Sequence, residues 1–292
     1  RQEGEILMAA ASTLTEPGFR KILFQRPSTV VALVVFIGIV AACFLLPLLG
    51  ITEIGGMSVR NRLTPPGTEY LLGADAFGRD LLGRLLVAGQ TSLGIGLGVA
   101  VLSSIAGITI GLLAGFFRRL DTPLSRLIDA MMAFPDILLA LSLVAIFGGT
   151  MVNVVLALSV VYAPRIARIV RASTLVIREL PYVEAARALG TLTPTIMVTH
   201  VLRNIMSPIL VQATFIFAYA MLAEAGLSFL GVGVDPRTPT WGIMVNEGRQ
   251  FIDNAFFMIL FPGIAIALSV LSLQIVGDGL RDALDPKLAK ES

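Results

Sequence analysis

The chain has 292 residues, of which 55% are hydrophobic and only 14% are charged, and its mean hydropathy is +0.85. Soluble domains carry about a quarter charged residues, so this composition excludes an ordinary water-soluble domain and indicates an integral membrane protein. The sequence contains one cysteine, Cys43, and one histidine, His200. A single cysteine excludes an internal disulfide, and so few nitrogen and sulfur ligands make us expect no bound metal.

Six apolar stretches are predicted to cross the membrane as helices, because a hydrocarbon core about 30 Å thick requires roughly 20 apolar helical residues. The first stretch is too long for the apolar region of a signal peptide, so we expect no cleaved leader. The fourth carries Arg165 and Arg168 in its last turns, where we expect their charged ends to reach the interface. We predict an all-α membrane protein with a transmembrane domain at 29–277, an N-terminal arm at 1–28 and a tail at 278–292. The predicted spans are about 29–49, 89–117, 128–147, 151–170, 204–229 and 254–277.

The lysines and arginines are distributed unevenly along the chain. Most of them fall at 1–26, 118–126, 165–203 and 281–290, which six spans place on one side of the membrane. An excess of positive residues near span ends marks the cytoplasmic side. We therefore expect both termini and the 165–203 region to be cytoplasmic. The other side is expected to hold Arg60, Arg62, Arg79, Arg84, Arg237 and Arg249.

The loop at about 178–203, between the fourth and fifth spans, carries its own helix signals. Pro181 suits the first helical position, where its missing N–H costs nothing, and Glu184 in the first turn interacts favourably with the helix dipole. Gly190 is typical of the position just after a helix, because glycine adopts the left-handed conformation. Thr193 is expected to cap a second helix. We predict two short helices joined by a sharp turn.

This loop has three possible roles. A helix-turn-helix can bind DNA, but this one has few positive charges and is tethered at both ends to membrane spans, so we expect no nucleic-acid partner. A loop that only connects two spans needs neither helix signals nor this length. We therefore favour docking onto a cytoplasmic protein.

The second span carries small residues at every fourth position, namely Ser103, Gly107, Gly111 and Gly115. This spacing lets helix backbones approach closely in lipid. We expect these residues to pack within this bundle, and packing on a second membrane subunit is the alternative.

On the outer side, residues 77–88 are predicted to form a short amphipathic helix that lies in the interface. Trp241 is expected to anchor the outer loop at the same interface.

Two acidic residues, Asp136 and Glu224, fall inside predicted spans, where charges are costly and often functional. Asp136 follows Pro135, and we expect it to reach the interface or to bond backbone groups that the proline frees. Glu224 lies near the outer end of its span, where we expect water to solvate it. Both are candidate pathway or gate residues. A proton-coupled secondary transporter that uses both is an alternative function, although acids at opposite depths make a poor relay.

The sequence shows no nucleotide-binding or catalytic pattern. The only lysines are Lys21, Lys287 and Lys290, and none follows a glycine-rich phosphate-binding loop. No nucleophile stands in a recognisable pattern with a base, so we predict no catalytic residue. If the protein performs work, a partner must supply the energy.

Short motifs occur in a characteristic order along the chain. They are Leu72-Gly73-Ala74-Asp75, Gly78-Arg79-Asp80, Ala133-Phe134-Pro135, Glu184-Ala185-Ala186 with Gly190, Glu224-Ala225, Leu227-Ser228-Phe229-Leu230-Gly231, Pro239 with Trp241-Gly242, and Gly277-Asp278-Gly279-Leu280-Arg281-Asp282 with Asp285-Pro286. The motif at Glu184 resembles the EAA loop of binding-protein-dependent ABC importer permeases. Together the motifs, over about residues 25–288, resemble the C-type permease subunit of the dipeptide, oligopeptide and nickel importers. Arg203 departs from this pattern, which commonly has proline there, so the exit of the second loop helix is left open.

The resemblance implies a peptide importer's permease subunit, multi-pass in the bacterial cytoplasmic membrane, that forms half of the translocation pathway. It implies as partners a homologous second permease, two ATPase subunits that use ATP and Mg, an extracytoplasmic substrate-binding protein and the surrounding lipid. The chain itself is expected to bind no cofactor. A nickel-complex permease is the alternative within the family, and a membrane scaffold is an alternative without transport. The residues expected to couple to the ATPase are Tyr182, Glu184, Ala185, Ala186, Leu189 and Gly190.

Overall fold

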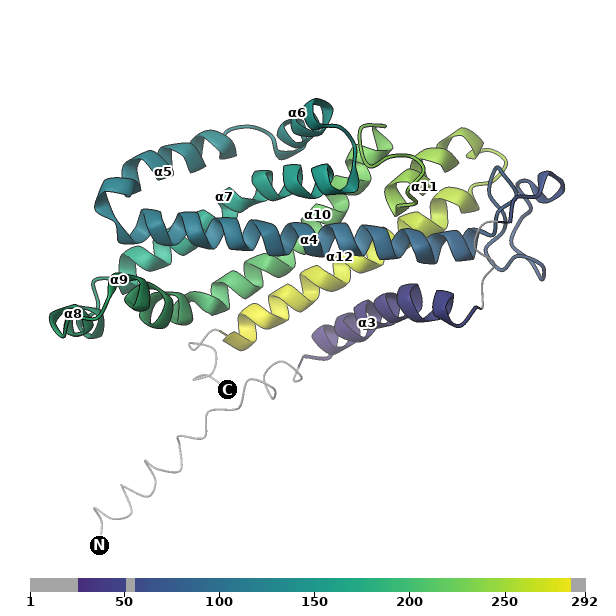
Figure 1. The fold of residues 1–292 in the computed structure, drawn as a ribbon. Helices are drawn as coiled ribbons and strands as arrows, with labels where there is room; N and C mark the ends of the chain where they lie inside the picture. Colours follow the sequence, from purple (N-terminus) through teal and green to yellow (C-terminus); the bar gives the residue numbers. More distant parts are fainter. Residues whose placement is uncertain (1–25, 51–55, 285–292) are drawn as a thin grey trace, which may run out of the picture.

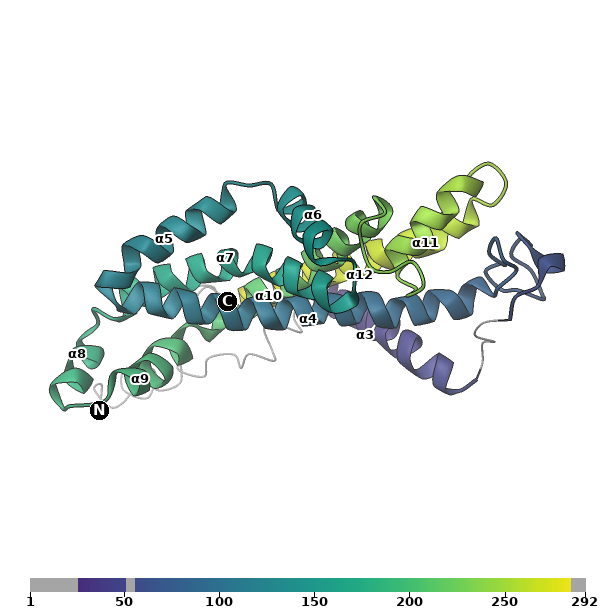
Figure 2. The same cartoon turned by 45° about the horizontal axis from the view of Figure 1, so that its top comes forward.

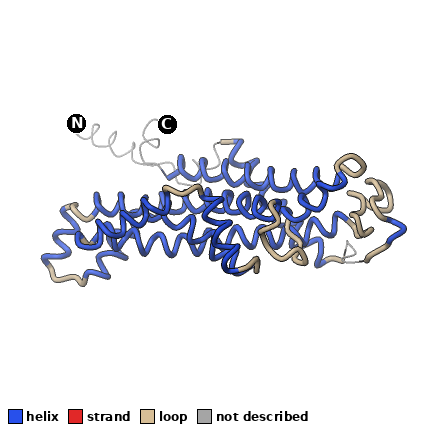
Figure 3. The backbone as a smooth tube through the Cα atoms, turned by 90° about the horizontal axis from the view of Figure 1, so that it is seen from above, coloured by secondary structure: helices blue, strands red, loops and turns tan. Residues whose placement is uncertain are grey.

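The structure, a computed structural model, describes residues 26–50 and 56–284. Over these residues it contains helices and one isolated β-bridge between Ala74 and Asp80, which confirms the all-α prediction. Long helices run along one another in an elongated bundle (Figures 1 and 3). They are α3 (Pro27–Leu48), α4 (Leu81–Phe116), α7 (Met151–Ile177), α10 (Met206–Phe229) and α12 (Phe257–Leu284).

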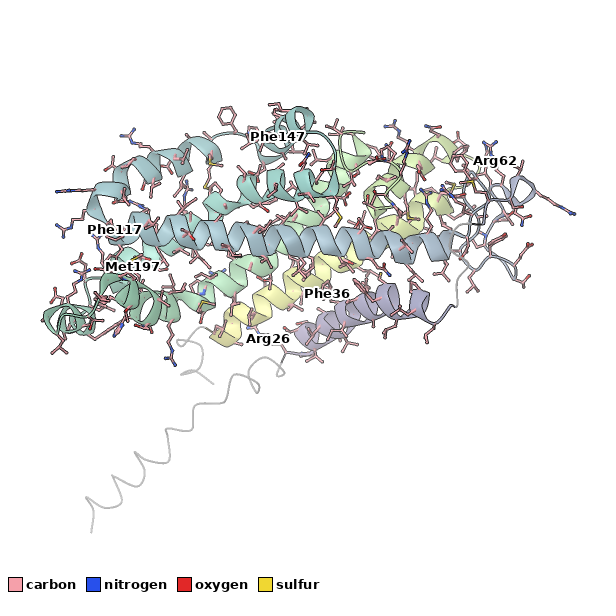
Figure 4. All side chains as sticks on the ribbon, in the orientation of Figure 1. Arg26, Phe36, Arg62, Phe117, Phe147 and Met197 are labelled. Atoms are coloured by element: carbon pink, nitrogen blue, oxygen red, sulfur yellow. The ribbon has the colours of Figure 1, made fainter. Side chains whose placement is uncertain are left out.

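Short elements occupy the two ends of the bundle. Figure 4 places Arg62 at one end of the molecule and Phe117 and Met197 toward the other. The end near Arg62 holds η1 (Val59–Asn61), α11 (Trp241–Gly248) and η4 (Arg249–Phe251). The end near Met197 holds α8 (Pro181–Ala188), α9 (Thr193–Thr195), η2 (Ile196–Val201) and η3 (Leu202–Ile205).

Among the described residues, five helices are long and apolar enough to cross a membrane, and a bent pair gives up to six crossings. The pair consists of α5 (Arg118–Met132) and α6 (Asp136–Phe147), whose axes are bent by 93° (Figure 2). The predicted span at 128–147 therefore contains a break between two helices rather than one straight helix. Pro135 has no N–H to donate and disfavours the helical conformation at Phe134, so the helix ends and restarts here.

The two ends of the described chain meet at the same end of the bundle. Arg26, just before α3, forms an ion pair with Asp282 in the last turns of α12. An even number of crossings brings the first and last helices back to one side, so this contact agrees with six spans in which the bent pair counts as one. α12 continues to Leu284, past the predicted span end at 277.

α4 has 36 residues, and at 1.5 Å per residue it is about 54 Å long. The carboxylate of Asp80 caps it by accepting hydrogen bonds from the backbone N–H of Leu82 (3.3 Å) and Gly83 (2.9 Å). The prediction of a separate interfacial helix at 77–88 is wrong, because α4 begins at Leu81 and continues without a break. Leu81 itself is 1% exposed and packs in the bundle.

The small residues of α4 pack against α7, which confirms the prediction of packing within the bundle. A Cβ atom at Gly107 would lie 2.6 Å from the Cβ of Ile166, and one at Gly111 would lie 2.6 Å from the Cβ of Val170. Gly115 meets Thr174 in the same way one turn further on. Close approach of the two backbones makes α4 and α7 a tightly packed pair.

Trp241, at the start of α11, is buried in a second part of the core between α3, α4, α10 and α12. Its side chain is 1% exposed, and its Nε1 donates a hydrogen bond to the backbone oxygen of Leu85 at 2.9 Å. The expectation that Trp241 anchors a loop at the lipid interface is therefore wrong. Gly89 explains the difference, because a Cβ there would lie 2.8 Å from the indole ring, and its absence leaves room for the ring.

Candidate functional site

The end of α8 is shaped by Gly190. The backbone N–H of Thr191 donates to the oxygen of Ala186, and that of Gly190 donates to the oxygen of Arg187, both at 3.0 Å. These two bonds form a Schellman motif, which requires a left-handed residue after the helix. Gly190 supplies it with a φ of +77°. Nothing lies within 4 Å of a Cβ placed there, so backbone conformation alone selects glycine.

α8 has one buried and one exposed face. Val183 and Ala186 are buried in a small cluster with Ile196 of η2, against which Phe116 and Ile177 also pack. The opposite face is exposed, and Leu189 just after it is 86% exposed. Of the predicted coupling residues, only Ala186 therefore lies on the buried inner face. Those on the outer side are Tyr182, Glu184, Ala185, Leu189 and Gly190.

The second predicted loop helix is not a separate element. α9 has only three residues, and it continues through the π-helical η2 and the 3₁₀-helical η3 into α10. Leu192, not Thr193, holds the capping position, and no side chain caps this end. Arg203 lies in η3, where the winding changes before α10 begins.

Aromatic and polar contacts connect α8 to this irregular stretch. The ring of Tyr182 stacks on that of His200, with centroids 6.3 Å apart. Asn204 Nδ2 donates to the Tyr182 hydroxyl at 3.3 Å. α8 is thus attached to the helical path that leads into α10.

Arg165 in α7 forms an ion pair with Asp136 in the first turn of α6. The side chains are 32% and 36% exposed, respectively. The guanidinium also lies 5.3 Å from the ring centroid of Tyr162 and 5.4 Å from that of Tyr219. Sequence reasoning did not predict that Arg165 and Asp136 are partners, and the expectation that each side chain reaches the interface stays a prediction.

Glu224 in α10 is completely buried, so the expectation that water solvates it is wrong. Its carboxylate accepts hydrogen bonds from the hydroxyls of Ser228 (2.7 Å) and Ser92 (3.4 Å). The Ser92 hydroxyl oxygen in turn accepts from the backbone N–H of Trp241 at 3.1 Å. Glu224 therefore connects α4, α10 and the start of α11, and it shares no hydrogen-bonding partner with Asp136. A pathway role for either acid stays a prediction.

Sequence reasoning missed a charged network at the end of the bundle that holds α11. Asp75 is fully buried and accepts from Arg79 Nε at 2.6 Å and from Arg84 Nη1 at 3.1 Å. Arg84 also binds both carboxylate oxygens of Glu247 in α11. The spacing of Asp75 and Arg79 in the sequence hints at one pair, but nothing in the sequence indicates Glu247, 163 positions from Arg84.

Comparison with known proteins identifies the class of this chain. Residues 107–290 match the model of a family described as binding-protein-dependent transport system inner membrane component. A protein of Brucella suis biovar 1, provisionally named a peptide transport system permease protein, is 50% identical over 92% of this chain and 91% of its own length. The dipeptide transport system permease protein DppC of Alkalihalophilus pseudofirmus is 39% identical over 92% of this chain and 88% of its own.

The fold also has a counterpart among solved structures. An inward-facing structure of the MetNI methionine ABC transporter aligns with a TM-score of 0.55 at 18% identity, covering 69% of this chain and 96% of that one. At this identity the likeness concerns the fold alone. The chain belongs to the family of binding-protein-dependent transport system inner membrane components. It is a multi-pass membrane protein of the permease class.

Proposed function

We propose that this chain is the permease subunit of an ATP-driven peptide importer in a bacterial cytoplasmic membrane. The observation that carries the proposal is likeness to peptide and dipeptide permeases over nine-tenths of the chain. The partners are a homologous second permease, two ATPase subunits that bind ATP and Mg, and an extracytoplasmic substrate-binding protein. The chain itself contributes half of the pathway and no catalytic residue.

α8 is the element that docks onto an ATPase subunit from the cytoplasm. Its inner face is held by Val183 and Ala186, and its outer side presents Tyr182 and Leu189, which are 43% and 86% exposed. An apolar residue so exposed on a well-terminated helix suits burial in a partner's groove. The start of α3 and the end of α12 meet at one end of the bundle, and the positive-inside rule assigns that side to the cytoplasm.

Site-specific crosslinking tests this docking. Cys43 is the only cysteine of this chain and is buried, so Cys43→Ala removes the chain's own thiol. In that background, Leu189→Cys is expected to crosslink to an ATPase subunit in membranes that contain the complete complex. Val59→Cys, which replaces a 92% exposed residue at the other end of the bundle, is the matched control and is expected to give no such product. Absence of the Leu189→Cys product, or equal products from both sites, would refute the docking assignment.

A further inference from the structure

The Arg165–Asp136 pair joins the middle of α7 to the first turn of α6. Arg165 is close to the middle of α7, so by helical rise roughly 20 Å of helix lies on each side of it. Arg165 and Asp136 both fall inside predicted spans, and charged side chains within a span are costly in lipid and face a protein interior or a water-filled cavity. Since about a third of each side chain is exposed in the single chain, this face must meet a pathway or a second subunit rather than lipid.

This face points away from α4. Ile166 packs on Gly107 of α4, whereas Arg165, its neighbour, points to another side of α7. In α10, Phe217 lies against Gly96 of α4, whereas Tyr219, two residues on, is 38% exposed and flanks Arg165. Arg165 and Tyr219 therefore share a surface on the side of the bundle that α4 does not cover.

A pocket of about 440 Å³ lies toward the end of the bundle where α12 ends. It includes Ile169, one helical turn from Arg165, and Phe215, one turn from Tyr219. Gln212 and Arg281 add polar groups to its wall. Its volume is in the range of about 300–1,000 Å³ that small-molecule sites occupy.

The pair retains unused hydrogen-bonding capacity. Among the described residues, Arg165 donates only to Asp136, although a guanidinium carries five N–H donors. The guanidinium carbon also lies 5.3 Å from the ring centroid of Tyr162 and 5.4 Å from that of Tyr219, within the range of cation–π attraction. An arginine fork matches a carboxylate, and Asp136 has a second oxygen that accepts from an ammonium group. Together the two side chains complement a molecule that carries both charges.

We infer that Arg165 and Asp136 form a recognition site in the translocation pathway for the charged ends of a zwitterionic di- or tripeptide. Arg165 binds the α-carboxylate, Asp136 binds the α-ammonium group, and Tyr219 packs on the peptide between them. The inference rests on the proposed import of peptides and specifies where this chain contacts the substrate. When the pathway is empty, the two side chains neutralise each other.

The test uses the complete importer in proteoliposomes, supplied with ATP and its binding protein, and measures initial uptake of radiolabelled dialanine. A hydrogen bond to a charged group contributes about 1.5–3 kcal/mol, so Arg165→Gln and Asp136→Asn are each expected to lower the maximal uptake rate about tenfold or more. The matched control is Arg168→Gln. Arg168 lies one turn along α7 and pairs with Asp129 on the exposed surface at 2.8 Å, so uptake is expected to stay within about twofold of the unsubstituted importer.

A charge exchange separates recognition from simple bracing of α6 against α7. The double variant Arg165→Asp with Asp136→Arg keeps an ion pair, so the complex is expected to assemble with normal basal ATP hydrolysis. Uptake of dialanine is nevertheless expected to stay low, because both charges now face the wrong ends of the peptide. Uptake restored by the double variant to the level of the unsubstituted importer would show that the pair is only structural. Normal uptake by both single variants would show that neither charge recognises the peptide. An unsubstituted importer that takes up no peptide would instead refute the proposed function.

Discussion

Val183 of α8 packs against Ile196 at the start of η2, and both side chains are almost completely buried. This contact joins α8, the proposed docking helix, to a helical path that continues through η2 and η3 into α10. α10 also carries Tyr219, which flanks the ion pair of Arg165. If an ATPase subunit displaces α8, the movement can therefore pass through these packed side chains to the face that holds Arg165.

Weakening this contact should separate ATP hydrolysis from transport. Val183→Ala removes two buried methyl groups and is expected to cost about 2 kcal/mol locally, which loosens α8 on η2. The number of peptides imported per ATP hydrolysed should fall several-fold in proteoliposomes, while ATP hydrolysis continues. Val198→Ala, at a 57% exposed position of η2, is the control and should leave this ratio unchanged. An unchanged ratio in Val183→Ala would contradict transmission through this contact.

Gly190 should tolerate asparagine better than valine. The left-handed conformation costs a non-glycine residue roughly 1–2 kcal/mol, and asparagine adopts it more readily than a β-branched residue. Gly190→Val should reduce copurification of the ATPase subunits and the rate of uptake, whereas Gly190→Asn should retain most of both. The space around Gly190 is open, so a steric clash cannot produce the difference. Equal behaviour of the two variants would argue against the turn as the cause.

A charge on the outer side of the α8 region should weaken binding of the ATPase. Leu189→Asp places a carboxylate at a position that docking would bury, so affinity for the ATPase subunit should fall tenfold or more, about 1.4 kcal/mol. Because Leu189 is 86% exposed, thermal unfolding of the isolated chain in detergent should not change. Val59→Asp at the other end of the bundle should bind the ATPase normally. Retained affinity in Leu189→Asp would contradict the docking face.

Arg84 should be important for stability. Arg84→Met leaves Asp75 with Arg79 alone and removes the cation that binds Glu247, so the loss of these charged hydrogen bonds is expected to cost about 1.5–3 kcal/mol. The melting temperature of the purified chain should therefore drop clearly. Arg60→Met replaces an exposed arginine of η1 and should have little effect. A melting temperature equal to that of the control would show that α11 is held by other contacts, such as those of Trp241.

Features that depend on neighbouring residues in the sequence were predictable. The spacing of Gly107, Gly111 and Gly115 predicts close helix packing, and the structure places α7 there. The positions of Pro181 and Gly190 predict the bounds of α8 within a residue or two. Both follow from the conformational preferences of single residues and from helical periodicity.

Features that depend on distant residues were not predictable. The burial of Glu224 depends on Ser92 and on the backbone of Trp241, which come from two other elements. The ion pair of Arg165 with Asp136 joins α7 to a helix whose start is set by the break at Pro135. A hydropathy pattern records neither contact, because it reports how apolar a segment is and not which side chains meet.

The most direct test of the central claim is peptide uptake by purified components. We predict that proteoliposomes containing this chain, its partner permease and both ATPase subunits accumulate dialanine only when ATP is inside and the loaded binding protein is outside. A nickel complex offered in the same way should not be accumulated. Uptake by this chain alone, driven by a proton gradient without ATP or partners, would contradict the account.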